Sequence, residues 1–227
     1  QVVDMKKISA IFVSIFSVIL TVVLLGACAQ NEDYTALVSE YRSDIYYAEQ
    51  DGCTIWAGFS EREYPYAADG VVSDKTKIFE IRATMPDNTK TYLISFECGS
   101  KKYGGEMSFD SVRQQYTYSE SISRPDEEEI TFSISEENAD TATTIAAKNM
   151  KIEGTLSLSS LLNKIMQSQK ETIKNYFGDP FNGEINVRLI SENDNCYFYV
   201  GLIDRNGRCL SFLADAASGE VLAQRES

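Results

Sequence analysis

Residues 196–214, CYFYVGLIDRNGRCLSFLA, reveal most about how this chain folds. Two runs rich in aromatic, β-branched and other apolar residues flank Asn206-Gly207, a dipeptide typical of the two-residue turn of a β-hairpin. With that turn, Cys209 lies opposite Asp204. The stretch therefore predicts two antiparallel strands joined by a tight turn.

In this register the predicted hairpin is apolar on both faces. One face carries Phe198, Val200, Leu202, Cys209 and Leu213, and the other carries Tyr197, Tyr199, Ile203, Leu210 and Phe212. A single helix can cover only one of these faces, so the other must meet the preceding domain, a second copy or an external partner. Tyr197, Tyr199 and Phe212 are therefore candidates for a binding surface, and packing against the preceding domain is the alternative.

Residues 151–227 predict one helix followed by four strands. Apolar residues recur at helical spacing from Leu161 to Phe177, and Gly178 and Pro180 end the helix. The strands are expected at residues 184–190, 196–203, 208–214 and 220–224. A helix packed on a four-stranded antiparallel meander is a compact α+β unit.

The last hairpin of this unit resembles the end of PepSY domains, which runs D-x-x-G, a strand, and D-A-x-T/S-G-E-V-L. Here the matching residues are Asp204-Arg205-Asn206-Gly207 and Asp215-Ala216-Ala217-Ser218-Gly219-Glu220-Val221-Leu222. PepSY-like domains occur in secreted and membrane-attached bacterial proteins and have been linked with restraining peptidases. The resemblance implies a binding module that regulates a peptidase or another process of the cell envelope, and it supplies no catalytic residue.

Residues 53–150 predict an antiparallel β-sandwich domain. Seven short strand-like runs are separated by turn residues, and Phe79, Ile81 and Ala83 alternate with polar neighbours as in a sheet with one face in water. An immunoglobulin-like topology is one arrangement that this strand count allows. Ahead of it, residues 31–50 carry apolar side chains at the spacing of an amphipathic helix, with Gly52 suited to the position after its end.

Leu25-Gly26-Ala27-Cys28 resembles the lipobox of bacterial lipoproteins, in which the cysteine becomes the lipid-modified first mature residue. The basic residues Lys6 and Lys7 and an apolar run precede it, so we expect residues 1–27 to be a signal peptide and residues 28–52 a lipidated N-terminus with its helix. An uncleaved N-terminal anchor is the alternative. The expected location is the cell membrane, with a lipid-anchored body that faces outside the cytoplasm.

The remaining cysteines are Cys53, Cys98, Cys196 and Cys209. The last two lie too far apart to bond in the predicted hairpin, since a disulfide needs Cα atoms about 4.4–6.8 Å apart and eight residues of strand span roughly 27 Å. Cys53 and Cys98 form a candidate disulfide of the sandwich domain. The alternative is that all four are buried thiols.

Composition excludes several functions. The formal net charge of −13 opposes binding to nucleic acid or to anionic lipid headgroups. The absence of histidine removes Ser-His-Asp and Cys-His catalysis and histidine-ligated metal sites, and no common nucleophile, redox or phosphate-binding motif is present. We therefore expect no metal, no cofactor and no catalytic residue.

Tyr64-Pro65-Tyr66 is a second candidate binding surface, because exposed tyrosines give large contact area at small entropic cost. The sequence as a whole predicts a lipid-anchored binding protein whose partner is another envelope or extracellular protein. The alternative is a carboxylate-dependent glycan hydrolase at the cell surface. A cleft lined by acids and aromatic residues would favour the hydrolase, and a flat apolar patch would favour the binding protein.

Overall fold

Strand β1, Val38–Gln50, is the central strand of the computed structural model, which describes residues 33–67, 69–193 and 195–227. It pairs with β2 (Cys53–Glu63), with the first part of β10 (Gly183–Glu192) in parallel, and near its end with β9 (Ala142–Asn149). The predicted N-terminal helix is therefore wrong. Within the described part of the chain, a short 3₁₀ turn, η1 (Tyr34–Leu37), precedes the strand.

A bulge in β1 explains the misleading helical spacing. Val38 pairs with Ile185 and Tyr41 pairs with Val187, so these two side chains share a face although they are three residues apart. The register shift between Val38 and Glu40 supplies the extra residue. Because a β-bulge changes a spacing of two into a spacing of three, it imitates one turn of a helix in the sequence.

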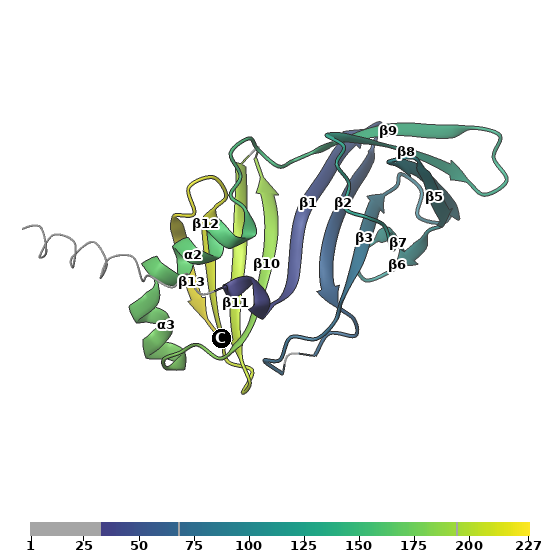
Figure 1. Cartoon of the computed structure of the whole chain (residues 1–227). Helices are drawn as coiled ribbons and strands as arrows, with labels where there is room; N and C mark the ends of the chain where they lie inside the picture. Colours follow the sequence, from purple (N-terminus) through teal and green to yellow (C-terminus); the bar gives the residue numbers. More distant parts are fainter. Residues whose placement is uncertain (1–32, 68, 194) are drawn as a thin grey trace, which may run out of the picture. The chain divides into compact units, whose positions relative to one another are not determined.

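The other elements follow along the chain. The strands are β3 (Lys75–Thr84), β4 (Tyr92–Cys98), β5 (Lys101–Glu106), β6 (Ser108–Asp110), β7 (Gln115–Glu120), β8 (Glu129–Glu136), β11 (Asn195–Asp204), β12 (Cys209–Asp215) and β13 (Val221–Glu226). The helices are α2 (Leu158–Ser168) and α3 (Lys170–Phe177) (Figure 1).

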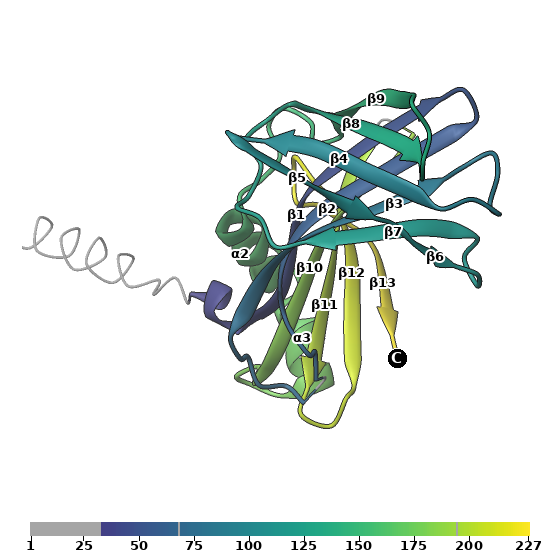
Figure 2. The ribbon, with the colours of Figure 1, turned by 90° about the vertical axis from the view of Figure 1, so that its right-hand side faces the viewer.

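All the strands belong to one sheet, in the order β13-β12-β11-β10-β1-β2-β3-β7-β6, with β9, β8, β4 and β5 branching from β1. The branch curls over so that β1, β2, β3, β7, β5, β4, β8 and β9 form a nearly closed ring (Figure 2). The structure is mostly antiparallel β, with 54% strand and 12% helix. The predicted α+β class and β-sandwich, including its immunoglobulin-like form, are therefore wrong: one sheet bends on itself where two separate sheets were expected.

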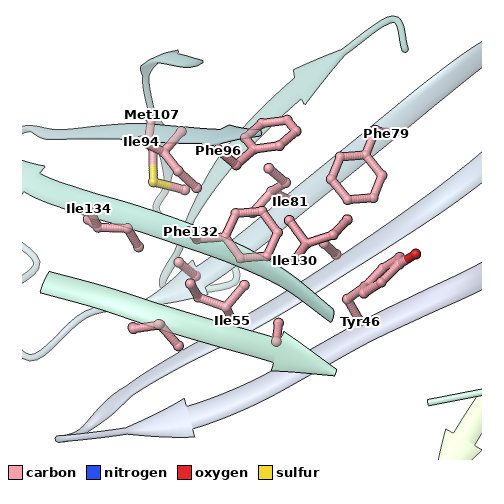
Figure 3. Packing of buried hydrophobic residues seen from close by; sticks show 14 of the residues in the cluster. Tyr46, Ile55, Phe79, Ile81, Ile94, Phe96, Met107, Ile130, Phe132 and Ile134 are labelled. Atoms are coloured by element: carbon pink, nitrogen blue, oxygen red, sulfur yellow. The ribbon is translucent and has the colours of Figure 1, made fainter. Parts of the chain in front are cut away.

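Aromatic side chains fill the inside of this ring. Phe79 of β3 and Phe132 of β8 both contact Phe96 of β4, with ring centroids 5.5 and 5.4 Å apart (Figure 3). Ile81 and Ala83 point to the same interior, as the alternation along residues 78–83 predicts. Each of these side chains is at most 4% exposed, so the ring has a dry core of its own.

Strands β10–β13 continue the sheet beyond β1, and the two helices cover one of their faces (Figure 1). Ser157 caps α2 by accepting a hydrogen bond from the Ser160 amide at 3.2 Å, and the buried stripe of α2 is Leu161, Leu162, Ile165 and Met166. Because β10 is hydrogen-bonded directly to β1, this segment is not the PepSY-like α+β unit that the sequence predicts.

The hairpin at residues 196–214 is one residue out of the predicted register. Ile203, not Asp204, lies opposite Cys209, because the turn has three residues and Gly207 adopts a positive φ of 77°. The Asp204 side chain accepts hydrogen bonds from the amides of Asn206 and Arg208, which stabilises the longer turn. A shift of one residue moves every side chain of β12 to the other face.

This shift removes the predicted two-sided apolar hairpin. Leu210 and Phe212 join Phe198, Val200 and Leu202 beneath the helices, and all five are at most 1% exposed. We call this the helix-covered face. The opposite face of β10–β12, named here the helix-free face, carries partly exposed residues that include Tyr197, Tyr199 and Leu213.

The predicted signal peptide, residues 1–27, and the predicted lipidation site, Cys28, lie outside the described residues. Among residues 33–67, 69–193 and 195–227, no helix is long and apolar enough to cross a membrane.

Candidate ligand-binding pocket

The loop between β2 and β3 reaches from the ring to the C-terminal strands. Tyr66 in this loop donates a hydrogen bond to Glu184 of β10 at 3.0 Å. Gly70, with a φ of 71°, lies so close to the turn between β11 and β12 that a Cβ there would come within 2.8 Å of the Arg205 nitrogen. Figures 1 and 2 both show the loop beside that turn. The loop therefore closes over part of the helix-free face.

A pocket of about 310 Å³ lies beneath this loop. Its lining residues come from β1, the end of β2, the loop and β10: Glu40, Arg62, Glu63, Tyr64, Pro65, Tyr66 and Arg188. Register places Glu40 between Arg62 and Asn186, so residues far apart in the sequence meet across three neighbouring strands. The pocket is lined mainly by charged groups and tyrosines.

Arg188 and Glu40 form the strongest ion pair of the pocket. The guanidinium donates two hydrogen bonds to the carboxylate, from Nε to Oε1 at 2.9 Å and from Nη2 to Oε2 at 2.6 Å. These bonds raise the pKa of Arg188 despite its partial burial. A bidentate pair of this kind fixes the geometry of both side chains. Glu40 therefore has both oxygens engaged.

A chain of hydrogen bonds connects the pocket residue Tyr66 to buried side chains that do not line the pocket. Ser39 donates to the side-chain oxygen of Asn186 at 2.7 Å, Asn186 donates to the Tyr66 hydroxyl at 3.3 Å, and Tyr66 donates to Glu184. Burial and the neighbouring Glu184 together raise the pKa of Tyr66 to about 12. The hydrogen bond from Asn186 acts in the opposite direction and is outweighed. Tyr66 therefore keeps its proton and can serve as the donor to Glu184 across the physiological pH range.

Two polar atoms at this site have no partner. They are Oε2 of Glu184 and Nε of Arg62, and in the described part of the chain no other buried side-chain nitrogen or oxygen lacks a hydrogen bond. Glu184 is 0% exposed. An unsatisfied buried polar group costs about 1–3 kcal/mol, and more when it is charged, so such groups are rare in native proteins. Arg62 is a lining residue of the pocket, whereas Glu184 does not line it and is joined to it through the hydrogen bond from Tyr66.

The candidate binding residues divide between the two faces. Tyr64 and Tyr66 line the pocket and are 73% and 44% exposed. Tyr199 lies opposite Arg188 on the helix-free face, and Tyr197 lies on that face opposite Ile190. Phe212 lies on the helix-covered face at 1% exposure, so it does not join a surface with the tyrosines.

Cys53 and Cys98 are both free, so the structure lacks the candidate disulfide. Cys53 is buried with its sulfur 3.3 Å from that of Met85. Burial, together with the nearby Glu127 carboxylate, raises the pKa of the Cys98 thiol to about 11. Cys53 belongs to the ring core and the partly buried Cys98 packs against it; of the four thiols, Cys53 and Cys196 are buried, whereas Cys98 and Cys209 are partly exposed.

Sequence reasoning missed Glu184 and four residues that line the pocket, namely Glu40, Arg62, Glu63 and Arg188. A signal was present in β10, where Glu184, Asn186 and Arg188 alternate with Ile185, Val187 and Leu189. That pattern marks a polar face of a strand, but it does not show which distant strands lie beside it. The tertiary structure supplies that information, because β2 and β10 both pair with β1, one on each side.

Among the described residues, no group of three or more His, Cys, Asp or Glu side chains is arranged to hold a metal ion. Comparisons of the chain with protein families, with curated proteins and with solved structures find no match. The chemistry of the pocket is therefore the basis for a functional conclusion.

Proposed function

We propose that this protein is a lipid-anchored, extracytoplasmic binding protein whose pocket beneath the β2–β3 loop holds a small polar ligand or a polar group of an envelope protein. The observation that carries the proposal is Glu184, which the pocket residue Tyr66 joins to the pocket: its carboxylate is fully buried, one oxygen accepts from Tyr66, and the other has no partner. A buried charge without full pairing is costly to the fold, and such sites often serve function.

The ligand chemistry follows from the unpartnered atoms. Oε2 of Glu184 calls for a donor such as an ammonium, amide or hydroxyl group, and Nε of Arg62 calls for an acceptor such as a carbonyl or carboxylate. A pocket of about 310 Å³ has room for a small molecule or for one side chain and its peptide group. The proposed ligand therefore carries both a donor and an acceptor.

A glycan hydrolase is the second candidate, because acids and tyrosines together line this pocket. Its carboxylates are poorly placed for that chemistry. Both oxygens of Glu40 bind Arg188, while Glu63 is 2% exposed and accepts a hydrogen bond from the Ser73 amide. A glycosidase needs one acid to give a proton to the substrate and a second carboxylate free to act beside it. The geometry favours binding over hydrolysis.

A panel of ligands tests the proposal. Wild type and Glu184→Gln are screened by thermal shift with amino acids, polyamines and simple sugars, and Glu97→Gln, at an exposed position of β4, is the matched control. We expect at least one donor-bearing compound to stabilise wild type and the control but not Glu184→Gln. A panel in which no compound separates the variants contradicts the proposal. Release of reducing ends from peptidoglycan by wild type, lost in Glu40→Gln, would favour the hydrolase.

The anchor has a separate test. Mass spectrometry of the N-terminal peptide from a bacterial host should show cleavage before Cys28 and a diacylglycerol on its sulfur, whereas Cys28→Ser should lack both and keep its leader. An unmodified, uncleaved leader in wild type would contradict the anchoring and leave the pocket proposal standing.

A further inference from the structure

Arg42, Arg82 and Arg188 gather on one face of the sheet. The two unpartnered atoms described above belong to other residues, Glu184 and Arg62. Arg42 of β1 lies opposite Arg188 of β10, and Arg82 of β3 lies opposite Trp56 of β2. Trp56 and Arg62 are six residues apart on β2 and so point to the same face of the sheet. Like charges on neighbouring strands repel one another, so this arrangement requires a compensating interaction.

Trp56 organises two of these arginines. The guanidinium carbon of Arg82 lies 4.7 Å from the centroid of the indole ring, and that of Arg42 lies 5.3 Å from it. These side chains come from the strands on either side of β2. The ring extends over Gly58, where a Cβ would come within 2.6 Å of the indole, so the position requires glycine. Cation–π contacts hold both guanidinium groups near one ring.

The charges around this ring do not balance. Arg188 pairs with Glu40, and Arg82 pairs with Glu80 at 3.1 Å. Arg42 has no carboxylate within ion-pair distance among the residues that the structure describes, and its recorded hydrogen bond runs from Nε to the Leu189 carbonyl at 3.2 Å. Burial and then the neighbouring Arg188 lower the pKa of Arg42. Three guanidinium groups thus face two carboxylates.

We propose that Arg42 and Arg82, held around Trp56 with Arg188 beside them, form a binding site for an oxyanion, that is, for a carboxylate or phosphate group of a ligand. The planar fork of arginine matches such groups with two parallel hydrogen bonds. The oxyanion supplies the missing negative charge beside Arg42. This site shares Arg188 with the pocket, but Glu184 and Arg62, whose unpartnered atoms carry the proposed function, take no part in it.

Trp56 reports directly on this site, because it is the one tryptophan of the chain. Its emission is followed while inorganic phosphate is added at constant ionic strength, with chloride as the reference anion. We expect a saturable change with phosphate that half-saturates in the millimolar range and no saturable change with chloride. A second arm uses vesicles of phosphatidylglycerol, with phosphatidylcholine vesicles as its reference, to separate a lipid headgroup from a soluble ligand.

Variants localise the effect. Arg42→Gln should weaken phosphate binding at least tenfold, whereas Arg113→Gln, an exposed arginine paired with Asp110, should leave it unchanged. If Arg42→Gln does not fold, Arg82→Gln takes its place. A response to phosphate assigns a soluble oxyanion, and a response to phosphatidylglycerol alone assigns a lipid headgroup. No saturable response to either, or equal binding by the Arg42, Arg82 and Arg113 variants, overturns the proposal.

Discussion

The two faces of strands β10 and β11 differ sharply, although alternate residues of the same two strands form them. On the helix-covered face, Val187, Phe198 and Val200 are 0% exposed and belong to the hydrophobic core that includes residues of α2. On the helix-free face, Glu184 is just as buried, yet one of its oxygens has no hydrogen bond. Burial by helices here stabilises the fold, whereas burial beneath the β2–β3 loop leaves polar groups unsatisfied.

This difference indicates how the molecule divides its tasks. The covered face contributes stability through close packing and gains nothing from an external partner. The free face holds charged groups that only a ligand or water can satisfy, at some cost to the free energy of unfolding. Substitutions on the two faces should therefore change the free energy of unfolding by different amounts and, at one position, in the opposite direction.

The largest effect is expected on the covered face. Phe198→Ala should lower the free energy of unfolding by about 3–5 kcal/mol, because it removes a buried ring and leaves a cavity. Its neighbour Tyr199→Ala, on the free face, should lower it by about 1 kcal/mol. Urea denaturation measures both. Equal losses would show that the two faces are packed alike.

Asp44 is a charged exception on the side of β1 that continues the covered face. Its side chain is 4% exposed and accepts hydrogen bonds from Arg124 at 2.8 and 3.3 Å. Asp44→Ala should lower the free energy of unfolding by about 2 kcal/mol, because it leaves the buried Ser43 hydroxyl and the half-exposed Arg124 guanidinium without their acceptor. Glu97→Ala, at an exposed position, is the control, with a change within about 0.5 kcal/mol.

The same residue makes stability depend on pH. Burial raises the pKa of Asp44, but hydrogen bonds from Arg124 and Ser43 outweigh it and hold the pKa below the ordinary value of an aspartate. A folded pKa below the unfolded one stabilises the native state above about pH 4, and this stabilisation is lost as pH falls through the folded value. As pH decreases from 6 to 2, the melting temperature should therefore fall less in Asp44→Asn than in wild type. Parallel curves of melting temperature against pH would contradict this role.

Tyr66→Phe should have a smaller effect on the free face. It removes the donor to Glu184 and leaves that carboxylate without its recorded hydrogen bond, so the free energy of unfolding should fall by about 1–2 kcal/mol. Tyr64→Phe is the matched control, because Tyr64 is 73% exposed and should change by less than about 0.5 kcal/mol. An unchanged Tyr66→Phe would show that the loop contact contributes nothing to the fold.

The smallest effect should have the opposite sign. Glu184→Gln removes an incompletely paired buried charge, so the free energy of unfolding should stay the same or rise by about 1 kcal/mol. Urea denaturation measures the change. A loss above about 2 kcal/mol would mean that Glu184 is structural, and the contrast between the faces would then fail.

Several parts of the fold were predictable from sequence, and others were not. The interior position of Phe79, Ile81 and Ala83 follows from strict alternation. Strand β1 was not predictable where a helix was expected, because a bulge gives Val38 and Tyr41 a helical spacing. The hairpin register failed for a related reason: Asn206-Gly207 is compatible with turns of two or three residues, and the Asp204 side chain selects the longer one.

The sequence by itself determined a β-rich, strongly acidic chain without histidine, since composition and local alternation depend on neighbouring residues alone. Tyr64 and Tyr66 could be proposed from it for the same reason. Only the tertiary structure decided that one sheet curls into a ring, that β1 joins this ring to the C-terminal strands, and that Glu40, Arg62 and Arg188 meet. Pairing between strands more than a hundred residues apart leaves no local trace in the chain, because hydrogen bonds between backbones are the same whatever the side chains.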